Sequence, residues 1–254
     1  MARILIKIGS ALISKNNKID YDFLERKINE ISKLFQENEI ILITSGAVAA
    51  GMEIENLNQR PKDILELQLL SGIGQIKLME DYKLLFSEKN IAISQILLTH
   101  HNFDNKEEQK TIVNIINSYL KQKVIPIINE NDLVNKEEFE SEFKFSDNDI
   151  LTAFVASFLK PDLVLILTDV NGLYNANPKT NSNPEFIELV EKIDDEIKQM
   201  ASKETNHTGL GGMFSKIIAA EIINKKGIDV IIANGNFSLN DIIENKVKRT
   251  LFKA

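Results

Sequence analysis

The sequence has 254 residues, of which 43% are hydrophobic and 26% charged, and it contains no cysteine. This composition is typical of a globular protein and excludes disulfides and thiolate metal sites. No apolar run approaches the ~18 residues of a membrane helix, and the N-terminal run is too short for a signal peptide. The formal net charge of −7 argues against a basic face for nucleic acid. We therefore expect a cytoplasmic protein that binds neither membranes nor nucleic acid.

Short apolar runs rich in β-branched residues alternate with amphipathic stretches along the chain. The expected strands are Arg3–Ile8, Glu39–Thr44, Ile91–Thr99, Val124–Asn129, Asp162–Thr168 and Asp229–Ala233. The expected helices are Tyr21–Glu37, Lys62–Glu88, Asn105–Gln122, Asp147–Leu159 and Met213–Lys225. Several strands are apolar on both faces, as in a parallel sheet that helices cover on each side. The pattern predicts an α/β protein.

Two segments interrupt this alternation. Glu137–Phe145 alternates phenylalanines with charges and is typical of an antiparallel hairpin. Asn175–Pro184 is rich in Asn and Pro and is typical of a surface loop. Neither segment has the character of a linker between domains.

Small and polar turns follow four of the expected strands. They contain Gly9-Ser10, Ser45-Gly46, Asn131-Asp132 and Thr168-Asp169. In an open parallel sheet, ligands bind at the carboxyl ends of the strands. Glycines at that edge let backbone amides approach a phosphate, and the helices that follow present their positive ends. The turns therefore predict one binding site at this edge.

Lys7 is the most informative single residue, because it lies in a strand that is otherwise apolar. A buried ammonium without a partner is costly, so Lys7 needs a carboxylate or a phosphate. The alternative is a lysine that reaches solvent from the end of its strand.

A glycine-rich turn, Gly209–Gly212, leads into the helix that begins at Met213 and has Lys216 in its first turn. Its spacing matches neither the P-loop nor the GxGxxG dinucleotide motif. A lysine at a helix start opposes the macrodipole, which favours an anionic ligand there. The alternative is a flexible loop with a solvated lysine.

The segment Ser146–Asp149 begins another helix, and its polar residues have two interpretations. Ser or Asp at a helix N-cap explains one or two of them without any function. Capping alone does not require an amide with a carboxylate on each side of it, as in Asp147-Asn148-Asp149. Similarly, Asn131-Asp132 is explained either by a turn or by a ligand. The three histidines show no metal-ligand spacing, and we expect no metal site made of side chains.

Taken together, these segments are similar to the glutamate 5-kinases of the amino acid kinase family. The matching pieces span essentially the whole chain in the family's order: Lys7–Ser10, Thr44–Gly51, Gln68–Leu70 with Gly74-Gln75, Gln95–Thr99, Pro126–Asp132, Asp147–Asp149, Leu167–Asp169 with Gly172–Tyr174, Gly211–Met213 with Lys216, and Thr250–Phe252. The turn Thr44–Ala47 resembles the glutamate kinases more than the acetylglutamate and isopentenyl phosphate kinases, which tend to have a His-Gly-Gly-Gly type turn there.

The resemblance implies a three-layer αβα sandwich with a central, mostly parallel sheet, in one domain spanning residues 1–254. Residues 1–160 would mainly bind the acceptor and residues 161–254 the nucleotide. The implied reaction is phosphorylation of the side-chain carboxylate of L-glutamate by ATP, the first step of proline biosynthesis. The implied assembly is a homo-oligomer, either a dimer or a tetramer.

The resemblance also implies roles for the residues at the predicted edge. The catalytic residues are Lys7, Lys216 and Asp149, where Asp149 holds the two lysines by ion pairing. Glutamate is bound by Ser45, Asp132 and Asn148, and phosphate by Gly9, Ser10 and Gly46. The nucleotide is bound by Lys7, Thr168, Asp169, Leu210, Gly211, Gly212, Met213, Phe214, Ser215 and Lys216. Mg²⁺ would be held mainly by ATP phosphates and water.

The chain departs from the family's pattern in three ways. Many bacterial members carry a C-terminal PUA domain, whereas we expect the kinase domain only. Ser146 stands where glycine is usual, and Leu210 and Phe214 stand where Thr and Ser are usual. One alternative is a kinase of the same fold that acts on carbamate, aspartate or a nucleoside monophosphate. Another is a regulator that binds a nucleotide or amino acid without catalysis, although the retained lysines argue against it.

Overall fold

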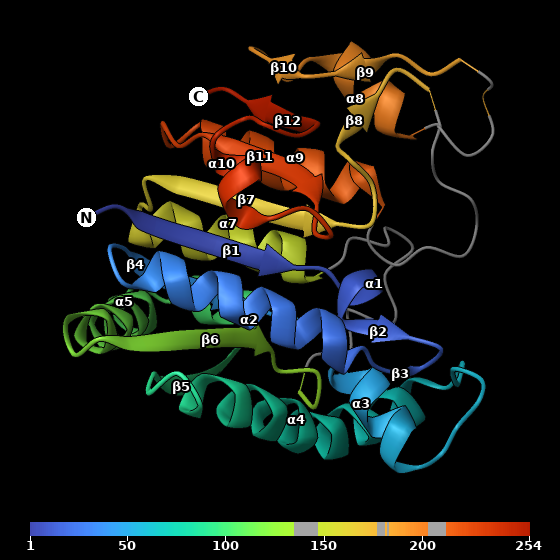
Figure 1. Cartoon of the computed structure of the whole chain (residues 1–254), viewed down its shortest axis with the longest axis vertical. Helices are drawn as coiled ribbons and strands as arrows, with labels where there is room; N and C mark the ends of the chain where they lie inside the picture. The colour runs from blue at the N-terminus through green and yellow to red at the C-terminus, as the bar shows by residue number, and fades with distance from the viewer. Residues whose placement is uncertain (135–146, 177–180, 182, 203–211) are drawn as a thin grey trace.

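The structure is a computed structural model that describes residues 1–134, 147–176, 181, 183–202 and 212–254. An eight-stranded sheet lies at its centre in the order β10-β12-β11-β7-β1-β4-β6-β5 (Figure 1). The strands are β1 (Arg3–Ile8), β4 (Glu39–Ile43), β5 (Ala92–Leu98), β6 (Val124–Glu130), β7 (Leu163–Thr168), β10 (Leu189–Val190), β11 (Val230–Asn234) and β12 (Arg249–Phe252).

The sheet is mostly parallel, as predicted. β12 is antiparallel to β11 and parallel to β10, and every other neighbouring pair is parallel. All six predicted strands are present, with ends that differ by at most one residue. The short strands β10 and β12 at one edge were not predicted, because they are too short to show a period.

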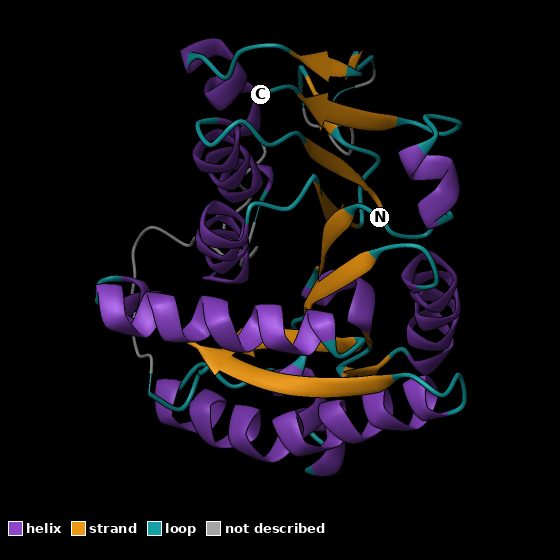
Figure 2. Cartoon of the chain, turned by 90° about the vertical axis from the view of Figure 1, so that its left-hand side faces the viewer, coloured by secondary structure: helices purple, strands orange, loops and turns teal. Residues whose placement is uncertain are grey.

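Helices cover both faces of the sheet and give the predicted three layers (Figure 2). One face packs against α5 (Lys106–Lys121), α7 (Asp147–Leu159) and α9 (Met213–Asn224). The other packs against α2 (Tyr21–Phe35), α4 (Ile64–Ser87) and α10 (Leu239–Ile243). The five predicted helices are confirmed to within two residues at each end.

Smaller elements fill the connections, and most lay outside the predictions. They are α1 (Ser10–Ile13), α3 (Ala47–Ile54), α8 (Asp195–Ser202), a 3₁₀ helix (His100–Phe103), the hairpin β2 (Ser14–Lys15) with β3 (Lys18–Ile19), and the pair β8 (Leu173–Tyr174) with β9 (Phe186–Ile187). The predicted hairpin Glu137–Phe145 lies outside the described residues, as does part of the predicted loop Asn175–Pro184.

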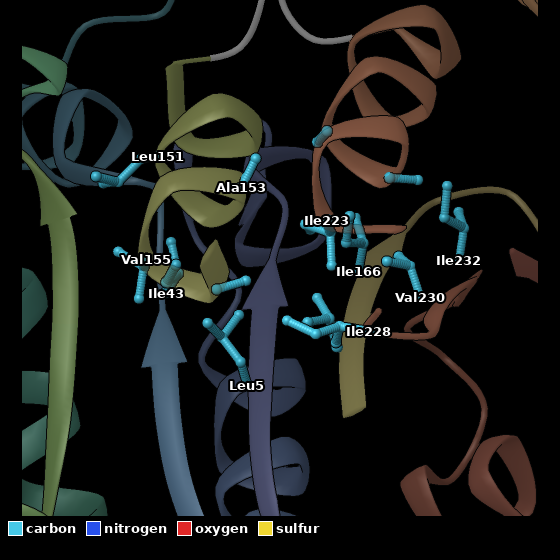
Figure 3. Packing of buried hydrophobic residues seen from close by; sticks show 14 of the residues in the cluster. Leu5, Ile43, Leu151, Ala153, Val155, Ile166, Ile223, Ile228, Val230 and Ile232 are labelled. Carbon is cyan, nitrogen blue, oxygen red and sulfur yellow. The ribbon is translucent and has the colours of Figure 1, made fainter. Parts of the chain in front are cut away.

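The core beneath α7 and α9 is fully apolar. Leu5, Ile43 and Ile166 are buried on the sheet, and Val155 and Ile223 are buried on the helices above them (Figure 3). Aliphatic side chains on both sides let the helices lie flat on the sheet. The packing fixes α7 and α9 so that their N-termini lie at the edge where the parallel strands end.

Two glycines allow α3 and α4 to cross in close contact. A Cβ atom at Gly51 would lie 2.0 Å from the carbonyl oxygen of Leu70, and one at Gly74 would lie 1.9 Å from that of Ala47. Only glycine permits this approach, since the obstructing atoms belong to the backbone. The contact brings the polar face of α4 to the carboxyl end of β6.

Candidate active site

The candidate site lies where β1, β4, β6 and β7 end and where α7 and α9 begin. Lys7 is the penultimate residue of β1, and Asp149 and Lys216 lie in the first turns of α7 and α9. The parallel register aligns Lys7 with Ile43 and Ile166 on the neighbouring strands. As predicted, residues far apart in sequence converge at this edge.

Two lysines share one carboxylate at the centre of the site. The Nζ atom of Lys7 lies 2.6 Å from Oδ1 of Asp149, and the Nζ atom of Lys216 lies 3.1 Å from Oδ2. Ser215 also donates its hydroxyl to Oδ2 of Asp149 at 2.7 Å. All four residues are buried. Two ammonium groups held side by side on one carboxylate also suit an anionic ligand such as a phosphate.

Burial and charge shift the protonation equilibria of this group. Burial lowers the pKa of Lys7 below its ordinary value, and Lys216 lowers it further, while Asp149 opposes both effects. Burial alone would raise the pKa of Asp149, but Lys216, Lys7 and Ser215 outweigh it and lower that pKa to about 2. Asp149 is therefore ionised at neutral pH and cannot act as a general acid or base there.

Glycines leave room for a ligand beside these charges. A Cβ atom at Gly9 would lie 3.7 Å from the Nζ atom of Lys7 and 3.1 Å from the carbonyl oxygen of Leu167. Gly46 has a φ angle of 107°, and a Cβ there would lie 2.9 Å from Cγ2 of Ile13. Both positions therefore favour glycine on steric grounds. Ser10, predicted to bind phosphate, is exposed at the start of α1.

Two of the predicted acceptor residues, Ser45 and Asn148, contact each other beside Asp149. Asn148, the neighbour of Asp149 in α7, donates from Nδ2 to Oγ of Ser45 at 3.0 Å. Its Oδ1 atom is buried and finds no hydrogen-bond partner in the part of the chain that the structure describes. A buried acceptor in that position fits a ligand with an ammonium group or another N–H donor.

Asp132 lies against α4. Its Oδ2 atom accepts the hydroxyl of Ser71 at 2.5 Å, and its carbonyl oxygen accepts from Nε2 of Gln68 at 3.0 Å. These two bonds hold the Asp132 turn against the helix, and a carboxylate has room to accept from a further donor.

The predicted nucleotide residues fall in two segments. Thr168 is buried at the end of β7, and Asp169 follows it with its side chain exposed. Gly212 is the N-cap of α9, and Met213, Phe214 and Ser215 form the first turn with Lys216. Phe214 packs partly against the core of this layer, and Ser215 is held by Asp149. Leu210 and Gly211 lie outside the described residues.

Sequence reasoning gave no role to the polar residues of α4. Gln68, Ser71 and Gln75 follow one another at helical spacing within an apolar helix, and all three are buried. Further along this face, Tyr82 shares a hydrogen bond with Oγ1 of Thr44 at 2.7 Å. The sequence feature that could have revealed them is their spacing at positions i, i+3 and i+7, because a narrow polar stripe on an apolar helix indicates a buried polar contact.

Within the described ranges, His, Asp and Glu nowhere gather in a group of three that could hold a metal ion. None of the helices in those ranges has the length and apolar character needed to cross a membrane.

Two buried lysines that share one carboxylate, beside glycine turns at the carboxyl ends of parallel strands, are the arrangement expected of a kinase. The model of the amino acid kinase family matches residues 2–234. The chain is 38% identical to the glutamate 5-kinase of Alkaliphilus oremlandii over 98% of its own length and 95% of that protein. It is 37% identical to the glutamate 5-kinase of Clostridium acetobutylicum, covering 94% of that protein. The chain therefore belongs to the amino acid kinase family and, within it, to the glutamate 5-kinase family.

A relative from Thermoanaerobacter sp., also named glutamate 5-kinase, is 38% identical, and the chain spans 67% of its length. Among solved structures, an isopentenyl phosphate kinase superposes with a TM-score of 0.67 at 17% identity, covering 99% of this chain and 100% of that one. The UMP kinase of Ureaplasma parvum gives 0.65 at 16% identity, covering 100% and 99%. These likenesses confirm the predicted fold.

Proposed function

We propose that this kinase transfers the γ-phosphoryl group of ATP to the side-chain carboxylate of L-glutamate, giving ADP and glutamyl 5-phosphate, the first step of proline biosynthesis. The supporting observation is the buried group formed by Lys7, Asp149 and Lys216, with Asn148 directly beside it. Adjacent residues of one helix thereby face the phosphoryl-transfer centre and the acceptor.

The reaction needs charge neutralisation rather than a base. The γ-carboxylate of glutamate has a pKa of ~4.3 and is already a nucleophile at neutral pH. The difficulty is bringing one anion onto another, so catalysis rests on positioning and on cations aimed at the transferred group. Lys7 and Lys216 supply the cations, while Asp149 fixes both ammonium groups before the substrates bind.

We assign the two ligands to two halves of the single domain. Residues 1–160 mainly hold glutamate, through Ser45, Asp132 and Asn148. Residues 161–254 mainly hold the nucleotide, through Thr168, Asp169 and the first turn of α9. The backbone of Gly9 and Gly46 approaches the phosphates between them, with Ser10 at the start of α1. The support is that these groups lie at one sheet edge on either side of Lys7.

Mg²⁺ fits this site as a partner of the nucleotide. The adjacent ammonium groups of Lys7 and Lys216 suit phosphate oxygens rather than a bare cation. ATP phosphates and water would therefore supply most of the magnesium ligands. The ion would neutralise charge that develops on the phosphates.

The test measures ADP release with ATP, Mg²⁺ and a panel of acceptors: glutamate, aspartate, carbamate and UMP. ADP release with glutamate alone supports the proposal. Release with another acceptor would assign the chain a different substrate, and ligand binding without turnover would indicate a regulator.

We also infer that the protein forms a homo-oligomer through α4. Leu65, Leu69, Ile73 and Ile76 form an exposed stripe on this helix, with exposed fractions of 62%, 57%, 40% and 67%. A second copy of the stripe is its natural partner, since a two-fold contact is self-complementary. Light scattering should give the mass of a dimer or tetramer, and Leu69→Lys should lower it, whereas Ile115→Lys on α5 should not. An unchanged mass for Leu69→Lys would exclude this surface.

A further inference from the structure

A pocket of about 200 Å³ opens between α4 and the ends of β5 and β6, beside the predicted acceptor site. Polar side chains line one part of it, Ser71 and Gln75 from α4 and Glu130 and Asp132 from the end of β6, and much of the rest of its wall is apolar. Of these, Glu130 and Asp132 are buried carboxylates, with 3% and 8% exposure. The carboxylate of Asp132 suits a small molecule with a cationic group, and the apolar side chains suit a short aliphatic part of it.

Gln75 is the buried amide of this pocket. Only 8% of the residue is exposed, and its Oε1 atom accepts from Nδ2 of Asn129 at 2.8 Å. This bond fixes the orientation of the amide. The Nε2 atom is buried, and no acceptor for it exists among the residues that the structure describes. A buried N–H donor without a partner is destabilising, which indicates that a ligand supplies the acceptor.

We propose that Nε2 of Gln75 binds the α-carboxylate of glutamate while Asp132 binds the α-ammonium. This assignment rests on the proposed function and names the contacts that recognise the amino-acid end of the substrate. The two groups of the substrate share one carbon atom, and Gln75 and Asp132 line one small pocket. The amide supplies a donor for the carboxylate, and the acidic wall selects an acceptor that also carries an ammonium.

The same geometry explains selection against simpler acids. Glutarate keeps the α-carboxylate of glutamate but lacks the ammonium, so nothing on the ligand offsets the negative charge of Asp132 beside that carboxylate. 4-Aminobutyrate keeps the ammonium but lacks the α-carboxylate, so it leaves Nε2 of Gln75 without an acceptor. Each analogue therefore reports on one of the two contacts.

The experiment compares Gln75→Met with the unchanged protein, measuring KM for glutamate and the competitive inhibition constants (Ki) of glutarate and 4-aminobutyrate. Gln75→Met should raise KM for glutamate and Ki for glutarate about 10- to 100-fold, the loss expected for one hydrogen bond to a charged group. Ki for 4-aminobutyrate and KM for ATP should change by less than about twofold. Gln122→Met, at an exposed amide that follows α5 and does not line the pocket, is the matched control and should leave all four values unchanged.

If Gln75→Met does not fold, Gln75→Glu replaces it, because it keeps the acceptor for Asn129 and the side-chain volume. Its added charge should weaken glutamate and glutarate further, but not 4-aminobutyrate. An equal loss for 4-aminobutyrate, or an equal effect of Gln122→Met, would overturn the assignment, as would an unchanged KM for glutamate. Absence of turnover of glutamate by the unchanged protein would instead refute the proposed function.

Discussion

Lys7 and Asp149 form a buried ion pair in which Nζ and Oδ1 lie 2.6 Å apart, joining the end of β1 to the first turn of α7. The same carboxylate holds Lys216 through its other oxygen. One helix turn therefore sets the positions of two cations from two other elements. Since Asn148 reaches Ser45 from that same turn, α7 is the element that aligns the two halves of the site.

Replacing either lysine should act mainly on turnover. Lys7→Met and Lys216→Met should each lower kcat by about 10²–10³-fold, since a cation contact made more strongly in the transition state affects kcat. Lys7→Met should be neutral or stabilising in thermal unfolding, because burial opposes its charge and Asp149 keeps Lys216 and Ser215.

Lys27→Met is the matched control for those variants. Lys27 is also fully buried, but it pairs with Glu30 at 2.5 Å and donates to the carbonyl oxygen of Phe237 at 2.6 Å. The Lys27→Met variant should therefore be less stable than the unchanged protein but have the same kcat. A Lys7→Met variant with normal kcat and a lowered melting temperature would show that Lys7 is only structural.

Asp132→Asn should raise KM for glutamate and leave KM for ATP nearly unchanged. Ser71 holds the carboxylate in the half that we propose binds the acceptor, and the neutral amide would lose the charge attraction for the α-ammonium. Steady-state kinetics with each substrate varied in turn provides the measurement. A loss of ATP affinity with normal glutamate affinity would assign Asp132 to the nucleotide instead.

Gly74→Ala should destabilise the protein by several kcal/mol or prevent folding, because its Cβ would lie 1.9 Å from the backbone of Ala47. Gly72→Ala, on the same helix, is the control. Its Cβ would lie 3.0 Å from Cδ2 of Leu133, the end of an exposed side chain that can move. Urea unfolding should find Gly72→Ala within about 1 kcal/mol of the unchanged protein. Equal stability of the two variants would contradict the close crossing of α3 and α4.

The lowered pKa of Asp149 should make the free energy of unfolding fall at acid pH. Its pKa is about 2 in the folded chain, against an ordinary value of 3.8, so the unfolded chain binds the proton more readily. This contribution is fully present above pH 4, is lost as pH falls toward 2, and amounts to ~2 kcal/mol. Urea unfolding between pH 5 and 2 should therefore show a smaller pH dependence for Asp149→Asn. Equal slopes for both proteins would contradict the lowered pKa.

The sequence predicted the sheet and its major helices because their signals are long and periodic. β7 is an almost continuous apolar run, β1 is apolar apart from Arg3 and Lys7, and α2 has a clear apolar face. The helix α3 was not predicted, because it is short, follows a glycine turn and contains Gly51. Its position depends on the contact with α4, which is not visible in local sequence.

The site was predictable where an unusual residue stood in a regular element, as Lys7 does in β1. Ser71 and Gln75 were not assigned, because their meaning depends on which residues face them across the fold. Asp132 and Asn129 reach them only after β6 has taken its place beside α4. The roles of the individual site residues stay predictions until the variants are measured.

Trapping the product with hydroxylamine tests the proposed reaction most directly. An acyl phosphate reacts with hydroxylamine to give a hydroxamate, so the assay reports phosphorylation of a carboxylate itself. With ATP and Mg²⁺, we predict hydroxamate from glutamate and far less from aspartate, whose side chain is one methylene shorter and reaches the γ-phosphate poorly. Equal hydroxamate formation from aspartate, or none from glutamate, would contradict the proposed function.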